Sequence, residues 1–86
     1  QWQELQIEID RAYNHFTARL YAKCPKLNET ELHVCYLLKL KVSPTDIANI
    51  TMRQVSTISS TRKRLYEKIH GVKGNAKQLD DFISKF

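Results

Sequence analysis

Apolar side chains recur at steps of three and four residues over the first twenty positions of the chain. They are Trp2, Leu5, Ile9, Ala12 or Tyr13, Phe16 and Leu20. This spacing predicts one amphipathic helix over residues 3–23, which Pro25 cannot continue. We expect Trp2, Leu5 and Ile9 to cover the core of the domain. The alternative is a helix that continues into an upstream domain and transmits its state.

Helix-start and helix-stop signals divide the remaining residues into four further helices. The start signals are Asn28 with Glu31 in the spacing of a capping box, Ser43 before Pro44, and Asn75; Gly71 and Gly74 break the chain. The predicted helices run from Asn28 to about Lys41, then over about 44–50, 55–69 and 76–85. No strand pattern or repeat is present, so we expect a single all-α domain of five helices over residues 1–86.

The predicted helix 55–69 has an unusual polar side. Ile58, Leu65 and Ile69 share its apolar side, and the opposite side carries Ser56, Ser60, Lys63 and Glu67. Arg62 lies at the edge of the apolar side, where its stem can pack and its head can reach outward. Small hydroxyl residues followed by cations suit a helix that enters the major groove of DNA. The alternative is an ordinary solvated helix whose Ser and Thr residues serve as caps.

The charge is unevenly distributed along the chain. Residues 1–52 contain six Lys or Arg and six Asp or Glu, whereas residues 53–86 contain eight and three, so the whole net charge of +5 lies in the second part. This asymmetry indicates an anionic partner for residues 53–86, although a solvated surface with a chance imbalance explains it equally well.

A short helix, a tight turn and a longer basic helix together form a helix-turn-helix pattern. Residues 27–71 resemble the helix-turn-helix domain of LuxR/NarL-type transcription regulators, in the winged-helix-like superfamily. The matching residues are Leu27, Glu31, Val34, Leu37, Leu38, Ser43, Ile47, Ala48, Thr57, Ile58, Arg64, Leu65, Lys68 and Ile69. The chain departs from the family in its turn, Thr51 to Gln54, and at Ser56, Ser59 and Thr61, where the family usually has basic residues. We expect Met52 and Val55 to pack the turn, unless the turn is wider than in the family.

The resemblance implies a bacterial, cytoplasmic regulator that binds double-stranded DNA in a sequence-specific manner, with helix 55–69 in the major groove. It implies a leading helix within residues 1–26, a helix-turn-helix core over 27–71 and a C-terminal helix within 72–86. The chain starts at Gln1, and we expect a C-terminal fragment of a Bacteroidetes-like regulator with an upstream sensor or repeat domain. The base-facing residues would be Ser59, Ser60 and Lys63, and the phosphate-facing residues Ser56, Thr57, Arg62, Arg64 and Lys68.

Other functional classes find less support in the sequence. His15, His33 and His70 lie on different predicted helices without an obvious carboxylate partner, so we expect no enzyme. We expect His33 on the surface, His70 at a helix end where it is a cation when protonated, and Asp80 and Asp81 on a solvated side. Cys24, His33 and Cys35 match no common zinc spacing, and we expect no metal and no cofactor. Two cysteines without a CxxC motif are typical of a reduced, cytoplasmic chain. No apolar window is long enough to span a bilayer, and we expect no membrane contact.

Two interaction hypotheses remain. The first is a protein-interaction module on a degenerate helix-turn-helix fold. Its basis is that the base-contacting start of helix 55–69 has Ser56, Ser59 and Thr61 where the family usually has basic residues. The second is a weak homodimer through the last helix, where Leu79, Phe82, Ile83 and Phe86 form one apolar stripe. The alternative for that stripe is burial in the core of the monomer.

Overall fold

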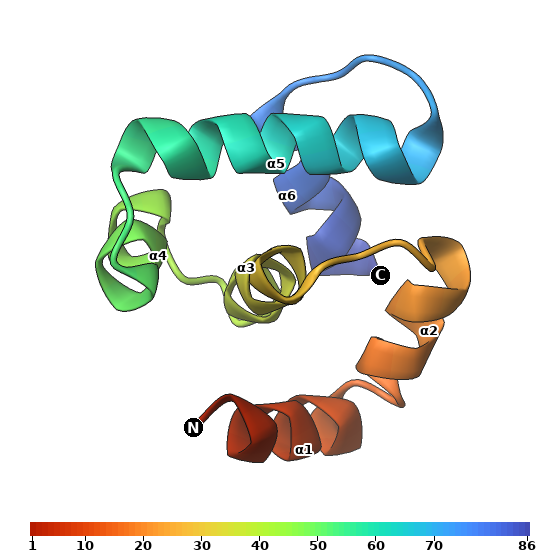
Figure 1. Ribbon diagram of the computed structural model, residues 1–86. Coiled ribbons are helices and arrows are strands. Elements are labelled where there is room, and N and C mark those ends of the chain that lie inside the picture. The colour runs from red at the N-terminus through yellow and green to blue at the C-terminus, as the bar shows by residue number, and fades with distance from the viewer.

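The computed structural model describes residues 1–86 as six helices and no strands (Figure 1). The helices are α1 (Trp2–Ala12), α2 (Phe16–Lys23), α3 (Glu29–Lys39), α4 (Pro44–Thr51), α5 (Val55–His70) and α6 (Ala76–Lys85). The predicted all-α class is confirmed, and the predicted count of five helices is wrong. No helix has the length and the apolar character needed to cross a membrane.

The extra helix arises because the predicted leading helix over 3–23 is broken between Ala12 and Phe16. Asn14 and His15 both adopt left-handed backbone conformations, with φ of 51° and 57°. The side chain of Asp10 then accepts a hydrogen bond from the backbone N–H of Thr17 at 2.8 Å, which satisfies one of the free donors at the start of α2. The residues that we predicted as one leading helix therefore form two helices joined by a tight turn.

The predicted start signals work as expected at three helices. Asn28 caps α3 in a capping box with Glu31, Ser43 caps α4 and accepts from the backbone N–H of Asp46, and Asn75 caps α6 with Gln78. Gly71 ends α5 in the left-handed conformation, with φ of 73°. At α5, by contrast, the N-cap is Gln54 and no side chain bonds to the free N–H groups.

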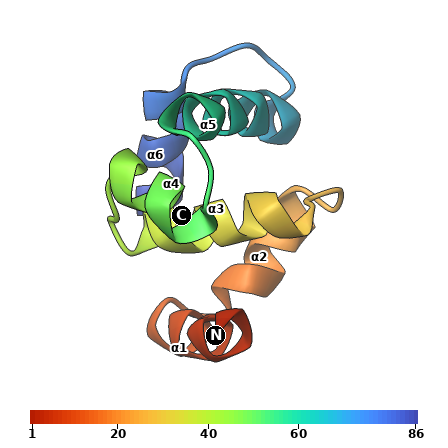
Figure 2. The same cartoon turned by 60° about the vertical axis from the view of Figure 1, so that its left-hand side comes forward.

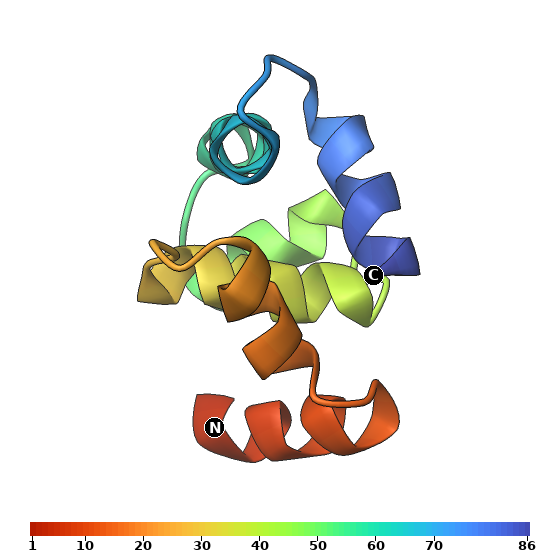
Figure 3. The same cartoon turned by 90° about the vertical axis from the view of Figure 1, so that its right-hand side faces the viewer.

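Helix α3 forms the centre of the molecule, and the other helices cover it. Figure 1 views α3 end-on, with α5 across the top, α1 across the bottom, α4 to the left and α2 to the right. Figure 3, in which α5 is nearly end-on, shows α6 descending beside it toward the C-terminus. Residues 34–38 of α3 are all buried, and Phe16, Leu20, Ile58, Leu65 and Ile47 pack around them in one core. This layout leaves α5 with one side against the protein and the other side free.

The two ends of the chain are both fixed to this core. Ile9 is buried, and Trp2 and Leu5 pack partly buried against the core, which confirms that α1 covers this domain. At the other end, the buried Lys39 donates to the last carbonyl groups of α6, at Ile83 and Ser84. A cation at this position is favourable because the carbonyl ends of a helix carry partial negative charge.

Candidate nucleic-acid interface

Helix α5 presents the polar side that the sequence predicts. Ile58 and Leu65 are fully buried and therefore fix the rotation of the helix. The predicted contact residues that are exposed to solvent are Ser56, Thr57, Ser59, Ser60, Lys63, Arg64 and Lys68. Figure 1 shows α5 at the edge of the molecule, with no other helix above it. The outer side of α5 is thus free of other helices, and only the loop 71–75 passes above its C-terminal half.

Arg62 is the exception among the predicted phosphate-facing residues. Its side chain is 8% exposed and forms an ion pair with Asp80 of α6. The Arg62 Nε donates to Oδ1 of Asp80 at 2.9 Å, and Nη2 donates to Oδ2. The guanidinium therefore holds α5 against α6, and the prediction of a phosphate-facing Arg62 is wrong. The expectation of a solvated Asp80 is wrong for the same reason.

A second side of α5 lies against the beginning of α3. A row of side chains at steps of four, three and four residues runs along this side of the helix. It consists of Thr57, Thr61, Arg64 and Lys68. Lys68 Nζ donates to Oε1 of Glu31 at 2.8 Å. Lys68 thus has a carboxylate partner inside the protein, and its charge is less available to a phosphate than that of Lys63 or Arg64.

The turn between α4 and α5 consists of Met52, Arg53 and Gln54. Met52 has a left-handed backbone, and the N–H groups of Met52 and Arg53 bond back to the carbonyl groups of Asn49 and Ala48. This pattern is a Schellman motif, which normally favours glycine at the left-handed position. The Met52 side chain is 91% exposed, so the expectation that Met52 packs the turn is wrong. In Figure 2, α4 and this turn come forward below the start of α5.

Arg53 is a cation of this region that the sequence interpretation did not include. It is exposed in the turn, and its Nη2 lies 3.4 Å from Oγ1 of Thr30, which belongs to the first turn of α3. The sequence signal that could have identified Arg53 was its position in the basic part of the chain, residues 53–86. Its spatial position next to α3 depends on the turn geometry, which the sequence pattern does not specify.

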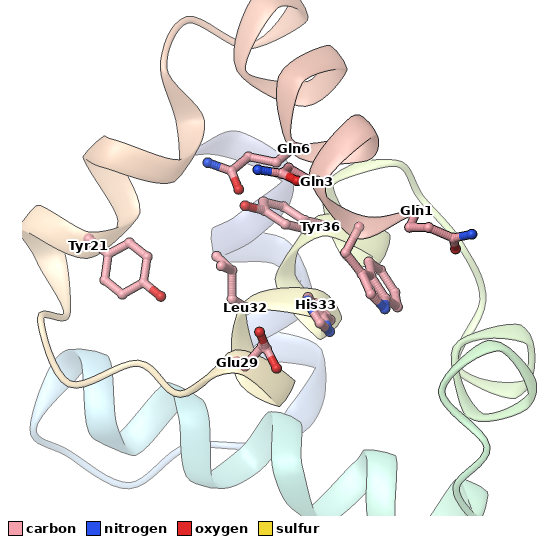
Figure 4. A pocket seen from close by; sticks show the side chains of 9 residues that line it. Gln1, Gln3, Gln6, Tyr21, Glu29, Leu32, His33 and Tyr36 are labelled. Carbon is pink, nitrogen blue, oxygen red and sulfur yellow. The ribbon is translucent and has the colours of Figure 1, made fainter.

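The largest hollow of the protein lies away from α5. It measures about 460 Å³ and is lined by residues of α1, α2 and α3. Gln3 and Gln6 of α1, Tyr21 of α2 and Glu29 of α3 surround it from three sides (Figure 4). Its edge includes His33, whose ring is stacked on that of Trp2 at 3.9 Å between centroids. His33 is therefore a half-buried residue at the surface, with one side of its ring covered by Trp2.

The remaining titratable groups form no metal site. No cluster of three His, Cys, Asp or Glu side chains has the geometry to hold a metal ion. Cys24 and Cys35 are both buried and reduced, and burial raises the pKa of the Cys35 thiol far above its ordinary value. His70 stacks on Tyr66, and its Nδ1 lies 3.2 Å from the carbonyl oxygen of Tyr66.

The apolar stripe of α6 belongs largely to the core of the monomer. Leu79 and Ile83 are fully buried, so the prediction that they form a dimer surface is wrong. Phe82 and Phe86 remain partly exposed and contact each other, with ring centroids 5.2 Å apart. Of the apolar stripe, only these two rings thus remain accessible for pairing through α6.

Three comparisons, with family models, with curated proteins and with solved structures, found no match for the chain. The resemblance to LuxR/NarL-type domains therefore depends only on the residues named above.

Proposed function

We propose that this chain is the DNA-binding output domain of a bacterial transcription regulator. In this proposal α4 and α5 form a helix-turn-helix, and α5 lies in the major groove of double-stranded DNA. The observation that carries it is the free outer side of α5, where small hydroxyl residues are flanked by cations that have no partner in the protein.

The charges around this side support an anionic partner. Of the eight Lys and Arg residues in 53–86, only Arg62 is buried. Lys63 and Arg64 on α5 and Arg53 in the preceding turn form no ion pair. Unpaired cations that surround an exposed helix are the usual electrostatic basis of duplex binding.

The small side chains on α5 support close approach. Ser56, Ser59 and Ser60 add little bulk to the first half of the helix, and their hydroxyls donate and accept hydrogen bonds. The N-terminus of α5 has no side-chain cap, so its free N–H groups are available to a phosphate. Lys63 is the cation closest to the centre of the outer side, and we assign it the base contact with Ser59 and Ser60.

One observation favours a second candidate, a protein-interaction module. Ile50, Met52 and Val55 are exposed apolar residues at the junction of α4 and α5, with Met52 the most exposed. Exposed apolar residues are favourable in a protein interface. The two candidates differ in salt dependence, because duplex binding weakens steeply as salt rises and apolar docking does not.

The experiment that tests the proposal is a selection from random duplexes with the whole chain, followed by affinity measurements on the enriched sequence and on a scrambled duplex. The proposal predicts an enriched motif that binds more tightly than the scrambled sequence. Recovery of no motif, with equal affinity for both duplexes, would contradict sequence-specific binding.

A further inference from the structure

A small polar hollow lies between the beginning of α3 and the side of α5. It measures about 210 Å³, and no apolar residue lines it. Asn28, Thr30 and Glu31 border it from α3, Arg53 from the turn, and Thr57, Thr61 and Arg64 from α5. None of these residues was predicted to form a cleft, because they come from three separate parts of the sequence.

The charge of this hollow is positive. Arg53 and Arg64 form no ion pair, whereas the only carboxylate, Glu31, is paired with Lys68, so the lining carries two positive charges and one negative charge. Glu31 Oε1 accepts from the backbone N–H of Asn28 at 3.0 Å and from Nζ of Lys68 at 2.8 Å. Two guanidinium groups without a counter-ion therefore line the hollow. Guanidinium groups bind oxyanions through two parallel N–H donors, which makes phosphate a suitable ligand.

Neutral donors complete the lining. The hydroxyl of Thr30 lies within reach of Arg53 and helps to hold the guanidinium at the rim of the hollow. Thr57 and Thr61 stand one turn apart on α5, and Thr61 is almost completely buried at the base of that side. Hydroxyls can donate to phosphate oxygens.

The size of the hollow limits what it can hold. Sites for drug-sized molecules measure about 300–1,000 Å³, and this hollow is smaller. At about 30 Å³ per water molecule, it accommodates a phosphoryl group together with a few waters. A single phosphate of a longer polymer fits these dimensions better than a free nucleotide.

We propose that this hollow, bounded by Arg53, Arg64, Thr57 and Thr61, holds one backbone phosphate of the duplex. The inference rests on the proposed function, because the phosphate belongs to the DNA that α5 enters. It adds Arg53, Thr30 and Thr61 to the contact surface. The phosphate lies beside the outer side of α5, and it fixes the angle at which the helix meets the groove without reading any base.

The test compares Arg53→Gln with Arg11→Gln in the whole chain. Both variants remove one exposed positive charge, but Arg11 lies on α1, outside the hollow and at the opposite end of the molecule from α5. Affinity for the selected and the scrambled duplex is measured over a salt series. We expect Arg53→Gln to weaken binding to both duplexes by the same factor, about tenfold, and to reduce the salt slope by about one. Arg11→Gln should leave the affinity within about twofold.

A second measurement follows the amide NMR signals of Thr57 and Thr61 during titration with inorganic phosphate. We expect both signals to shift in the wild-type chain and to stay fixed in the Arg53→Gln, Arg64→Gln double variant. Wild-type duplex binding with no effect of Arg53→Gln overturns this inference and leaves the proposed function standing. A change of sequence preference in Arg53→Gln also overturns it, because a phosphate contact affects all sequences equally. Failure of the wild-type chain to bind any duplex overturns both, and phosphate-induced shifts would then indicate a site for a free anion.

Discussion

Arg62 and Asp80 connect α5 to α6 through a two-pronged ion pair, with Nε of Arg62 2.9 Å from Oδ1 of Asp80. The guanidinium is almost completely enclosed, whereas the carboxylate keeps about a third of its surface exposed. The pair is therefore asymmetric. Removal of Asp80 leaves the enclosed guanidinium charge of Arg62 without a partner. Removal of Arg62 leaves the carboxylate of Asp80 in contact with water.

This asymmetry predicts unequal costs for the two single substitutions. Asp80→Ala should lower the free energy of unfolding by about 2 kcal/mol, less than the roughly 3–5 kcal/mol of a fully buried pair. Arg62→Met, which keeps an apolar stem in place, should cost about 1 kcal/mol or less. Urea denaturation of the two variants measures the difference. Equal costs would show that the guanidinium is well solvated in the folded protein.

Arg62→Met also separates stability from binding. Because Arg62 does not reach the outer side of α5, the folded variant should bind duplex as tightly as the wild-type chain. A clear loss of affinity in a variant with a normal thermal melt would return Arg62 to the phosphate-facing set.

The sequence accounts well for the local features of the fold and less well for its long-range contacts. The caps at Asn28, Ser43 and Asn75 act within three residues, so their spacing alone identifies them. The rotation of α5 follows from Ile58 and Leu65 in the same way. The partner of Arg62 lies 18 positions away, on a helix whose orientation no local pattern specifies.

The break after α1 illustrates the same limit. Residues 13–15 contain neither Gly nor Pro, and the apolar stripe continues across them. The turn is held by Arg19, whose guanidinium donates to the carbonyl oxygens of Tyr13 and Asn14 and to that of the distant Phe86. The candidate phosphate site was hidden for a similar reason, because its walls come from α3, α5 and the turn before α5.

Met52 offers a simple test of the turn between α4 and α5. Its left-handed backbone is unfavourable for a residue with a Cβ by about 1–2 kcal/mol. Its side chain makes little contact, so Met52→Gly should raise the free energy of unfolding by about 0.5–1 kcal/mol after the greater freedom of glycine in the unfolded chain is included. Urea denaturation provides the measurement.

The matched control for this substitution is Gln54→Gly, two residues further along. Gln54 is exposed and has an extended backbone with φ of −79°. Glycine brings no relief of backbone strain there, but it is tolerated at the N-cap of a helix, so we expect the variant to lose about 0.5 kcal/mol or less. Destabilisation by Met52→Gly of the same size would contradict the turn geometry.

The stack of His33 on Trp2 predicts a pH dependence of stability. Burial lowers the pKa of His33 below its ordinary value of 6.5, and the nearby Glu29 opposes this effect only in part. The folded protein thus favours the neutral imidazole. Its contribution is fully present above pH 6.5 and is lost as the pH falls through 6.5 toward the lower pKa of the folded state. Urea denaturation at a series of pH values detects this loss.

His33→Gln isolates the effect, because His15 and His70 are present in both proteins. The variant should be less stable at pH 7.5 but should lose less stability than the wild type on acidification to pH 5. If the difference in free energy of unfolding between the two proteins stays the same from pH 7.5 to pH 5, the imidazole of His33 is equally solvated in the folded and unfolded states.

Phe82 tests whether α6 serves the monomer or a dimer. Its ring meets that of His70 edge-on, with 4.7 Å between the ring centroids, and packs against the core. We therefore expect Phe82→Ala to lower the free energy of unfolding of the monomer by about 2–3 kcal/mol. The denaturation midpoint should not depend on protein concentration in either protein. A wild-type midpoint that rises with concentration would support pairing through Phe82 and Phe86.

The assignment of Lys63 to the base-contacting side predicts a change of sequence preference. Lys63→Ala should reduce the discrimination between the selected and the scrambled duplex by about 1–3 kcal/mol. Arg11→Ala is the charge-matched control, because Arg11 is exposed on α1, at the opposite end of the molecule from α5 (Figure 1). Equal discrimination in Lys63→Ala and the wild-type chain would remove Lys63 from the reading surface.

The central claim is that the cations around α5 meet the phosphates of a duplex, and the salt dependence of binding tests it most directly. Fluorescence anisotropy with a labelled duplex gives the association constant between about 50 and 200 mM salt. Arg53, Lys63 and Arg64 are three cations that would displace about three counter-ions from the duplex, whether they lie against a phosphate or in the groove. The logarithm of this constant should therefore fall against the logarithm of salt with a slope of about −3. An affinity that does not change with salt, or no binding at the lowest salt concentration, would contradict the claim.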